Sequence, residues 1–391
     1  MEMPGVSYDQ LMRVPQIVRA YERLHTPSNF FQRLLRASPT DTPVVVSQQR
    51  TFGYDVYAAT RTLAPVTAPM APPSRVGLKP VRTETATLYR MHPSITIADE
   101  RVFATRPLGS FGLNTPVDAS GKKYVAMQIK HVRTMMDNSI EFMLSREFRG
   151  GFGIKAAGDQ FRLCDLGDAD VIASNQYAIP AGNIGNPNTV MGSGEEWTSS
   201  TAPVHEHLLA LSAYAAQVSG YAPKHIIMNG ITAIPLFTNS ILQGIGGDSY
   251  RIFDSLTNRQ VPAGEALTSG QYTVVFRALP QYIFHIYNEG LIQNEVVPNV
   301  DNQIGASFDK MIPDGYAIVI PDPGEWIGFA TGMEPVAYNV VDPGRVVTGL
   351  HVWRTREIDP ARFDIKFLLN YVPILPIPQA VFYMDVWGAT W

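Results

Sequence analysis

The sequence predicts a mixed α+β fold, and three patterns support this class. One long amphipathic helical pattern covers residues 120–149. Many strand signals of five to eight residues, separated by Gly, Pro, Asn and Asp, follow residue 249. No strand–helix–strand period repeats along the chain, so a doubly wound sheet or an α/β barrel is disfavoured.

The composition indicates a large core under a surface that carries little charge. Of the 391 residues, 45% are hydrophobic and 17% are charged, whereas about 25% of residues are charged in average soluble domains. We therefore expect much of the surface to be covered by other molecules. The formal net charge of −4 is divided unevenly, with +5 on residues 1–106 and −9 on the remainder.

The same inventory argues against several classes of protein. The single cysteine, Cys164, cannot form an intrachain disulfide or a cysteine-based zinc site, and a reducing compartment is expected. No stretch reaches the roughly 18 apolar residues of a membrane-spanning helix, so membrane insertion is not expected. The basic residues are scattered, and no helix-turn-helix, zinc-finger or RNA-recognition pattern occurs, so sequence-specific DNA binding is not expected.

The first hundred residues predict an arm followed by a long finger. Residues 1–43 mix short apolar pieces with prolines, and only 29–37 (NFFQRLLRA) predicts a short helix. Residues 44–56 and 81–98 alternate with period two, which predicts two long strands around a proline-rich tip. A lone two-stranded ribbon is at best marginally stable in water, so it must rest either on its own body or on a neighbouring copy.

A long helix is predicted from about residue 120 to residue 149. Gly150 and Gly151 end the pattern, and at 1.5 Å per residue the helix is a strut about 45 Å long. Apolar residues recur along it at three- and four-residue steps: Val125, Ile129, Val132, Met136, Ile140 and Met143. Charged residues are expected on the opposite face: Lys130, Arg133, Asp137 and Glu141.

The rest of the chain predicts short strands around two further helices. Residues 151–203 give strands and loops, a helix follows at 204–218, a buried strand at 225–229 and a third helix at 231–242. A compact, mostly β lobe is expected at 249–345, with strand signals at RIFDS, QYTVVFRA, QYIFHIY, YAIVIP and WIGFA. Residues 345–355 and 363–372 each predict one closing strand.

Motifs that carry chemistry are weak. His205 and His207 are two residues apart, whereas a metal-binding pair on a helix needs a spacing of four, so both are expected to be ordinary helix-start residues beside Glu206. Residues 244–248 (GIGGD) follow a helix and lack the Lys-Ser/Thr ending of a phosphate loop, so they predict a turn. Cys164 is expected to be a buried strand thiol. No metal, cofactor or catalytic residue is predicted.

The order of these parts resembles the major capsid fold of tailed phages, and the sequence is similar to its lambda type. The residues that carry the resemblance are NFFQRLLR (29–36), PSRVGLKP (73–80), GEEW (194–197) and DPAR (359–362). The resemblance implies an N-arm at 1–43, an E-loop at 44–97, a P domain at 98–222 with a spine helix at about 120–149, an A domain at 223–345, and C-terminal strands at 346–391 that return to the P domain.

The resemblance also implies a function. The chain would be a structural protein, not an enzyme, that assembles into hexamers and pentamers of an icosahedral shell around double-stranded DNA. Its partners would be further copies of itself, a separate scaffolding protein, a portal protein, possible decoration proteins and DNA bound non-specifically, without membrane or cofactor. It would be assembled in the host cytoplasm and end in the virion capsid.

Candidate contacts between subunits lie on the arm and the finger. They are Phe30, Arg33, Arg36, Arg61, Arg75, Lys79 and Arg82. Lys79 could form an isopeptide cross-link if a glutamate lay nearby, but an electrostatic contact is the favoured role. Two alternatives stay open: a cellular nanocompartment shell of the same fold, and a hydrolase with Glu195, Glu196 and His207 as its candidate residues.

Overall fold

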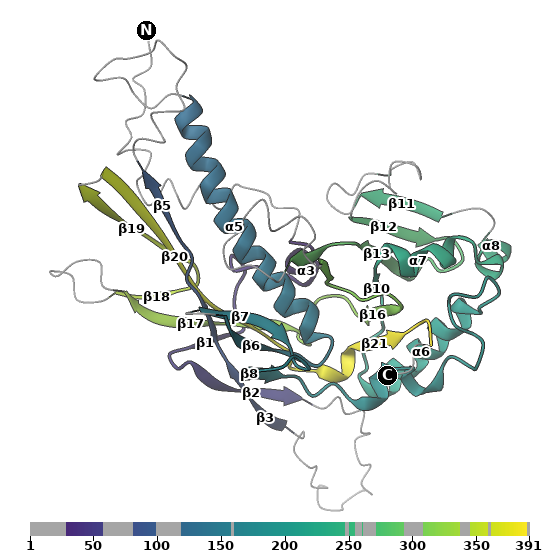
Figure 1. The fold of residues 1–391 in the computed structure, drawn as a ribbon. Coiled ribbons are helices and arrows are strands. Elements are labelled where there is room, and N and C mark those ends of the chain that lie inside the picture. Colours follow the sequence, from purple (N-terminus) through teal and green to yellow (C-terminus); the bar gives the residue numbers. More distant parts are fainter. Residues whose placement is uncertain are drawn as a thin grey trace, which may run out of the picture. The chain divides into compact units, whose positions relative to one another are not determined.

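The protein is described here from a computed structural model, and Figure 1 shows its elements. The described residues are 29–57, 81–98, 119–157, 160–246, 250–254, 260, 271–292, 308–336, 345–358 and 361–388. The chain divides into two compact units. The first comprises 1–52, 86–142 and 329–373, and the second comprises 53–85, 143–328 and 374–391.

The first unit is organised around strand β20 (Ala361–Ile374), which belongs to a seven-stranded sheet of order β1-β17-β20-β19. Residues 362–366 of β20 pair on one side with β19 (His351–Ile358) and on the other with β5 (Ser94–Ala98). The remaining strands are β1 (Val45–Ser47), β4 (Tyr89–Met91), β17 (Gly328–Val336) and β18 (Arg345–Thr348). Alternate residues of β20, from Phe363 to Tyr371, are buried, as a strand with one face on the core requires.

Two helices complete the described part of the first unit. Helix α3 (Phe30–Leu35) is short, and helix α5 (Ala119–Glu147) contributes its residues up to Phe142 to this unit. The apolar stripe expected from the sequence is buried in α5, which confirms the predicted helix and its core-facing side. Asp137 and Glu141 are also buried, so the prediction that they lie on an exposed charged face is wrong.

The second unit contains a seven-stranded sheet of order β11-β12-β13-β10-β16-β21-β9. Its central strand β10 (His225–Met228) is fully buried, because it lies between β13 and β16 and shares a buried cluster with residues of helix α6 (Val204–Val218) and helix α7 (Gly230–Phe237). The other strands are β9 (Ile184–Gly185), β11 (Tyr250–Asp254), β12 (Gln271–Phe276), β13 (Ile283–Tyr287), β16 (Tyr316–Ile320) and β21 (Phe382–Asp385). Ile226, Met228 and Phe284 share one buried cluster with Leu208 and Leu211 of α6.

Three smaller sheets accompany these. β6 (Gly151–Ala157) is flanked by β7 (Gln160–Asp165) and β8 (Val171–Gln176), and β14 (Gly290–Ile292) pairs with β15 (Phe308–Lys310). β2 (Thr51–Tyr57) pairs with β3 (Val81–Thr87) as a two-stranded ribbon. Short 3-10 turns lie at Ala181–Asn183, Pro187–Thr189 and Pro378–Ala380.

The structure corrects two predicted elements. The single helix expected at 231–242 is two helices, α7 and α8 (Ser240–Gly246), because Asn239 begins a new helix: its Oδ1 accepts the N–H of Leu242 at 2.9 Å. The single strand expected at 345–355 is divided into β18 and β19 around Gly349, whose φ of 73° does not suit a strand. By contrast, α6 has the predicted bounds.

Strand β17 also departs from the expected single lobe at 249–345. It pairs with β1 in parallel and with β18 antiparallel, so its residues from Phe329 to Val336 belong to the sheet of the first unit. The parallel pairing brings Val45 opposite Ala330, nearly three hundred residues away along the chain.

The two glycines after α5 give a stability prediction. Both have positive φ, 96° at Gly150 and 141° at Gly151, and a Cβ at Gly151 would lie 2.2 Å from the backbone oxygen of Asn175. A Cβ at Gly150 meets nothing within 4 Å. We expect Gly150→Ala to lower the free energy of unfolding by about 1–2 kcal/mol through backbone strain, and Gly151→Ala by roughly 3 kcal/mol or more, because overpacking is added. Urea denaturation of both variants tests this, and equal losses would contradict it.

Candidate assembly surfaces

The ribbon formed by β2 and β3 has one covered face and one exposed face. Phe52, Tyr54 and Ala86 are buried, and the N–H of Tyr57 donates to the backbone oxygen of Pro376 at 2.8 Å. The described part of the ribbon therefore contacts other residues of its own chain. Residues 58–80, which include the proline-rich tip, lie outside the described residues.

The exposed residues of the ribbon are mostly polar. They include Thr51, Asp55, Thr83 and Thr85, whereas Val81 is apolar and 48% exposed. Thr83 Oγ1 donates to Asp55 Oδ1 at 3.3 Å, and the hydroxyls of Thr51 and Thr87 lie 3.4 Å apart.

Helix α3 is held on α5 by a buried glutamate. The N–H groups of Phe31 and Gln32 donate to the two carboxyl oxygens of Glu141 at 2.9 and 3.0 Å, and Gln32 Nε2 donates to the backbone oxygen of Asp137 at 3.2 Å. These donors are the first N–H groups of α3, which have no partner within the helix. The carboxyl of Glu141 therefore fixes the point at which the arm reaches the first unit.

The environment of Glu141 disfavours its charged form. Burial raises the pKa of Glu141 to about 8, even though the two N–H donors act in the opposite direction, and Asp137 adds to the rise. Glu147, further along α5, is also fully buried, and neither of its carboxyl oxygens has a hydrogen-bond partner among the described residues. Burial raises the pKa of Glu147 well above its usual range, and Glu147 in turn adds to the rise that burial causes in the pKa of Tyr54.

A pH dependence follows from Glu141. Between about pH 4.5 and pH 8 the folded chain keeps a proton on Glu141 that the unfolded chain has released, so rising pH lowers the free energy of unfolding. The slope from this group is at most about 1.4 kcal/mol per pH unit. Urea denaturation between pH 6.5 and pH 8 should show a smaller fall in the free energy of unfolding for Glu141→Gln than for the native protein. Glu206→Gln, at an exposed position of α6, is the control, and an unchanged slope in Glu141→Gln would contradict the prediction.

The predicted contact residues have different environments. Phe30 is only 5% exposed, with its ring edge-to-face against Phe31 at 5.3 Å, so in this structure it anchors α3 internally. Arg33 and Arg36 are exposed on α3. Arg82 is 69% exposed on the ribbon and forms an ion pair with Glu84. Three further candidates lie outside the described residues: Arg61, Arg75 and Lys79.

The candidate residues of the hydrolase alternative lie close together in the second unit. His207 Nε2 is 3.2 Å from Glu195 Oε2, and the indole N–H of Trp197 donates to His207 Nδ1 at 3.3 Å. Because an indole N–H can only donate, Nδ1 of His207 carries no proton and Nε2 donates to Glu195. Both ring nitrogens are therefore occupied, and His207 has no free nitrogen with which to accept a proton from a substrate.

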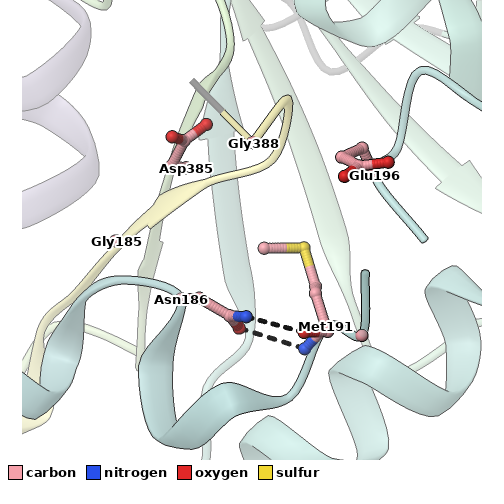
Figure 2. A pocket seen from close by; sticks show the side chains of 7 residues that line it. Gly185, Asn186, Met191, Glu196, Asp385 and Gly388 are labelled. Carbon is pink, nitrogen blue, oxygen red and sulfur yellow. Dashed lines mark hydrogen bonds between the residues drawn. The ribbon is translucent and has the colours of Figure 1, made fainter. Parts of the chain in front are cut away.

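A shallow hollow of about 240 Å³ lies beside this cluster (Figure 2). Glu196 and Asp385 border it, and Asn186 closes one side through two hydrogen bonds to the backbone of Met191 at 2.7 and 3.0 Å. Asp385 Oδ1 accepts the N–H of Trp387 and Glu196 Oε1 accepts that of Gly194. Both carboxylates therefore accept hydrogen bonds from nearby backbone N–H groups.

His207 gives a direct test of the hydrolase alternative. His207→Ala leaves the buried indole N–H of Trp197 without an acceptor, so we expect a loss of about 1–3 kcal/mol in the free energy of unfolding. His205→Ala, on the same helix and more exposed, should change it by less than about 0.5 kcal/mol. Thermal or urea denaturation distinguishes the two; an unchanged stability of His207→Ala together with a lost hydrolytic activity would favour the hydrolase.

Other sequence expectations can be placed as well. Cys164 is a buried thiol in β7, as predicted. Within the described ranges, no three or more His, Cys, Asp or Glu side chains are grouped to hold a metal ion. In that same part of the chain no helix is both long and apolar enough to cross a membrane. The turn predicted at 244–248 is wrong for residues 244–246, which end helix α8, and Gly247 and Asp248 lie outside the described residues.

Sequence reasoning missed the role of the buried acids of α5. Glu141 and Glu147 occur in a stretch, from Ile140 to Phe148, in which every residue is buried, so the helix there has no exposed face. One feature of the sequence could have indicated this burial: apolar residues around the two acids are denser than in a helix with one exposed face.

Comparison with known proteins was made by family, by curated sequence and by structure. No family model and no curated protein matches the chain. Among solved structures, a protein assigned as the capsid protein of an Escherichia coli CFT073 prophage matches with a TM-score of 0.51 and 13% identity over 98% of this chain and 100% of that one. A phage-related protein of Bordetella bronchiseptica RB50 matches with a TM-score of 0.49 and 10% identity over the whole of both chains. An encapsulin of Synechococcus elongatus PCC 7942 matches with a TM-score of 0.43 and 11% identity over 94% and 91%. The chain has the fold of the first of these.

Proposed function

We propose, from this capsid-protein fold, that the chain is the major head protein of a tailed phage and assembles into an icosahedral shell. The observation that carries the proposal is the likeness to the prophage capsid protein, which extends over 98% of this chain and all of that one. The low charge content supports it, because a shell subunit covers much of its surface with neighbours. The role is structural rather than enzymatic, which the occupied ring of His207 supports.

In this proposal each part of the chain has a place in the shell. The N-arm (1–43) and E-loop (44–97) reach neighbouring subunits, the P domain (98–222) and the C-terminal strands (346–391) form the wall, and the A domain (223–345) meets its copies at the centre of each hexamer or pentamer. The exposed Arg33, Arg36 and Arg82 supply polar contacts at the interfaces. Several interfaces, each of which buries about 1,600 Å² or more of surface, together stabilise the shell.

The proposal also includes partners. A separate scaffolding protein, a portal protein and possible decoration proteins would act with the chain during assembly in the host cytoplasm, and the finished virion shell would enclose double-stranded DNA. DNA contact would be non-specific, and the net charge of −9 on residues 107–391 indicates that counterions rather than the subunit neutralise most phosphates. Similarity to the lambda type remains a prediction.

Electron microscopy of the protein expressed with its neighbouring genes tests the proposal. We expect closed particles of uniform diameter, and DNA within those recovered from an infected or induced host. Particles that contain a protein cargo instead of DNA would favour the nanocompartment alternative. A monomer that persists at high concentration, with or without the neighbouring genes, would overturn both.

A further inference from the structure

Two buried histidines of the second unit lie in direct contact. His225 of β10 and His285 of β13 are 60 residues apart in sequence, and the parallel pairing of the strands places Ile227 opposite His285. Because alternate residues of a strand share a face, His225 and His285 point to the same side of the sheet. His225 Nδ1 lies 2.9 Å from His285 Nε2, and both residues are buried.

Polar partners extend this contact at both ends. His225 Nε2 lies 2.9 Å from Asp322 Oδ1, and the other oxygen of Asp322 accepts Lys224 Nζ at 2.8 Å. At the far end, Thr273 Oγ1 of β12 lies 3.3 Å from His285 Nδ1. The charged groups that face the pair are thus Asp322, from the loop after β16, and Lys224, from the residue before β10.

These partners fix which atom donates and which accepts in each of the hydrogen bonds just described. Although partial burial acts to raise it, hydrogen bonds from Lys224 and His225 hold the pKa of Asp322 below its usual range, so the carboxylate only accepts. His225 must then donate through Nε2 and accept at Nδ1, His285 must donate through Nε2, and its Nδ1 is left to accept the hydroxyl of Thr273. The four groups form one hydrogen-bonded relay, in which the donor and acceptor of each bond determine those of the next bond.

A proton added to either imidazole forces the hydrogen bonds of the relay to rearrange. If His225 becomes protonated, its Nδ1–H faces the Nε2–H of His285, so His285 must change tautomer and the hydroxyl of Thr273 must rotate to accept. If both rings are protonated, two N–H groups and two positive charges face each other across 2.9 Å. Burial lowers the pKa of His225, and burial together with the charge of His225 lowers the pKa of His285 to about 3.

We propose that Thr273, His285, His225 and Asp322 form an acid-sensitive latch that joins β12, β13, β10 and the loop after β16 while both imidazoles are neutral, and that opens when they take up protons. The loop end of the latch is connected to the core, because the indole N–H of the buried Trp326 donates to the backbone oxygen of Asp322 at 2.7 Å. The latch depends on contacts inside the second unit and not on the proposed shell.

Histidine NMR of the intact protein from pH 8 to pH 4 tests the geometry directly. With ring-labelled histidine, assigned by the variants His225→Gln and His285→Gln, both rings should carry their proton on Nε2 at neutral pH. The signal of His285 should not titrate near its ordinary pKa of 6.5 while the protein stays folded. Protonation of His285 near pH 6.5 in the folded protein, or a proton on Nδ1 of either ring at neutral pH, would overturn the proposal.

The pH dependence of unfolding tests the consequence. Because the unfolded chain binds a proton that folded His285 excludes, the equilibrium constant of unfolding should rise about tenfold for each pH unit below 6.5 from this ring alone. His285→Gln keeps a donor toward His225 but cannot titrate. For each pH unit below 6.5, the equilibrium constant of unfolding of this variant should therefore rise about tenfold less than that of the native protein. His131→Gln, at an exposed position of α5, is the control and should keep the native slope. Equal slopes in all three proteins would overturn the latch.

Discussion

Replacing Arg146 with methionine should lower the free energy of unfolding by about 3 kcal/mol, at the lower end of the range for a broken buried ion pair. The guanidinium of Arg146 is 1% exposed and donates to Asp165, to Asp309 Oδ2 at 2.9 Å and to the backbone oxygen of Met311 at 2.9 Å. It therefore connects α5 to β7, to β15 and to the segment after β15. Methionine fills much of the volume but removes one charged donor from each of the three acceptors.

The partial exposure of the two carboxylates sets the size of this effect. Asp165 and Asp309 are 32% and 38% exposed, so water can hydrate part of them once Arg146 is removed. The loss should therefore stay below the 5 kcal/mol that fully buried partners can cause. Arg149→Met is the matched control, since Arg149 is 24% exposed and lies 3.6 Å from Asp165, and it should lose under about 1 kcal/mol. Equal losses in the two variants, measured in urea, would contradict the role given to Arg146.

Removing the tip of the finger should abolish closed shells without lowering the stability of the subunit. In the variant, residues 64–80 are replaced by a short Gly-Ser linker. The described contacts of the ribbon, at Tyr54 and Tyr57, lie outside the deleted range, so thermal denaturation should give a midpoint within a few degrees of the native one. Electron microscopy should show free subunits or open fragments in place of particles.

Lys79→Ala is the control for the deletion, because it removes the lysine and keeps the length of the loop. It should still form particles, since one ion pair at a protein surface contributes about 1 kcal/mol or less to a contact. Boiled particles of the native protein that migrate as multimers on a denaturing gel, and of Lys79→Ala that migrate as monomers, would show that Lys79 is cross-linked. Normal particles from the deletion variant would refute the assignment of residues 44–97 as an inter-subunit loop.

Local patterns predicted the elements best where neighbours along the chain decide the structure. Helix α6 has the predicted bounds, because Pro203 precedes it and Gly220 follows it. The break at Asn239 was missed, because an asparagine within an apolar helical pattern can either be tolerated or begin a new helix, and its hydrogen bonds to Leu242 and to the backbone of Ala202 decide the outcome.

The candidate sites were less predictable, because distant parts of the chain build them. The burial of Glu141 depends on α3, more than one hundred residues earlier, and the contact of His225 with His285 depends on the parallel pairing of β10 and β13. The sequence places both histidines in strands but does not show which strands are neighbours. Likewise, the hydrogen bond from Trp197 that fixes His207 could not be expected from the spacing of His205 and His207.

The pairing of the chain's early strands with its late ones has a consequence for synthesis on the ribosome. β1, β4 and β5 are made first, yet their partners β17 and β20 are made last. At about 5–20 residues per second, the interval between Ala98 and Tyr371 lasts roughly 15–50 s. During that interval β4 and β5 lack their partner β20 in the nascent chain, and the sheet of the second unit lacks β21. When several nascent chains lie close together on one polysome, their unpaired early strands would be able to pair with strands of another copy. A chaperone that covers these strands would act at this stage.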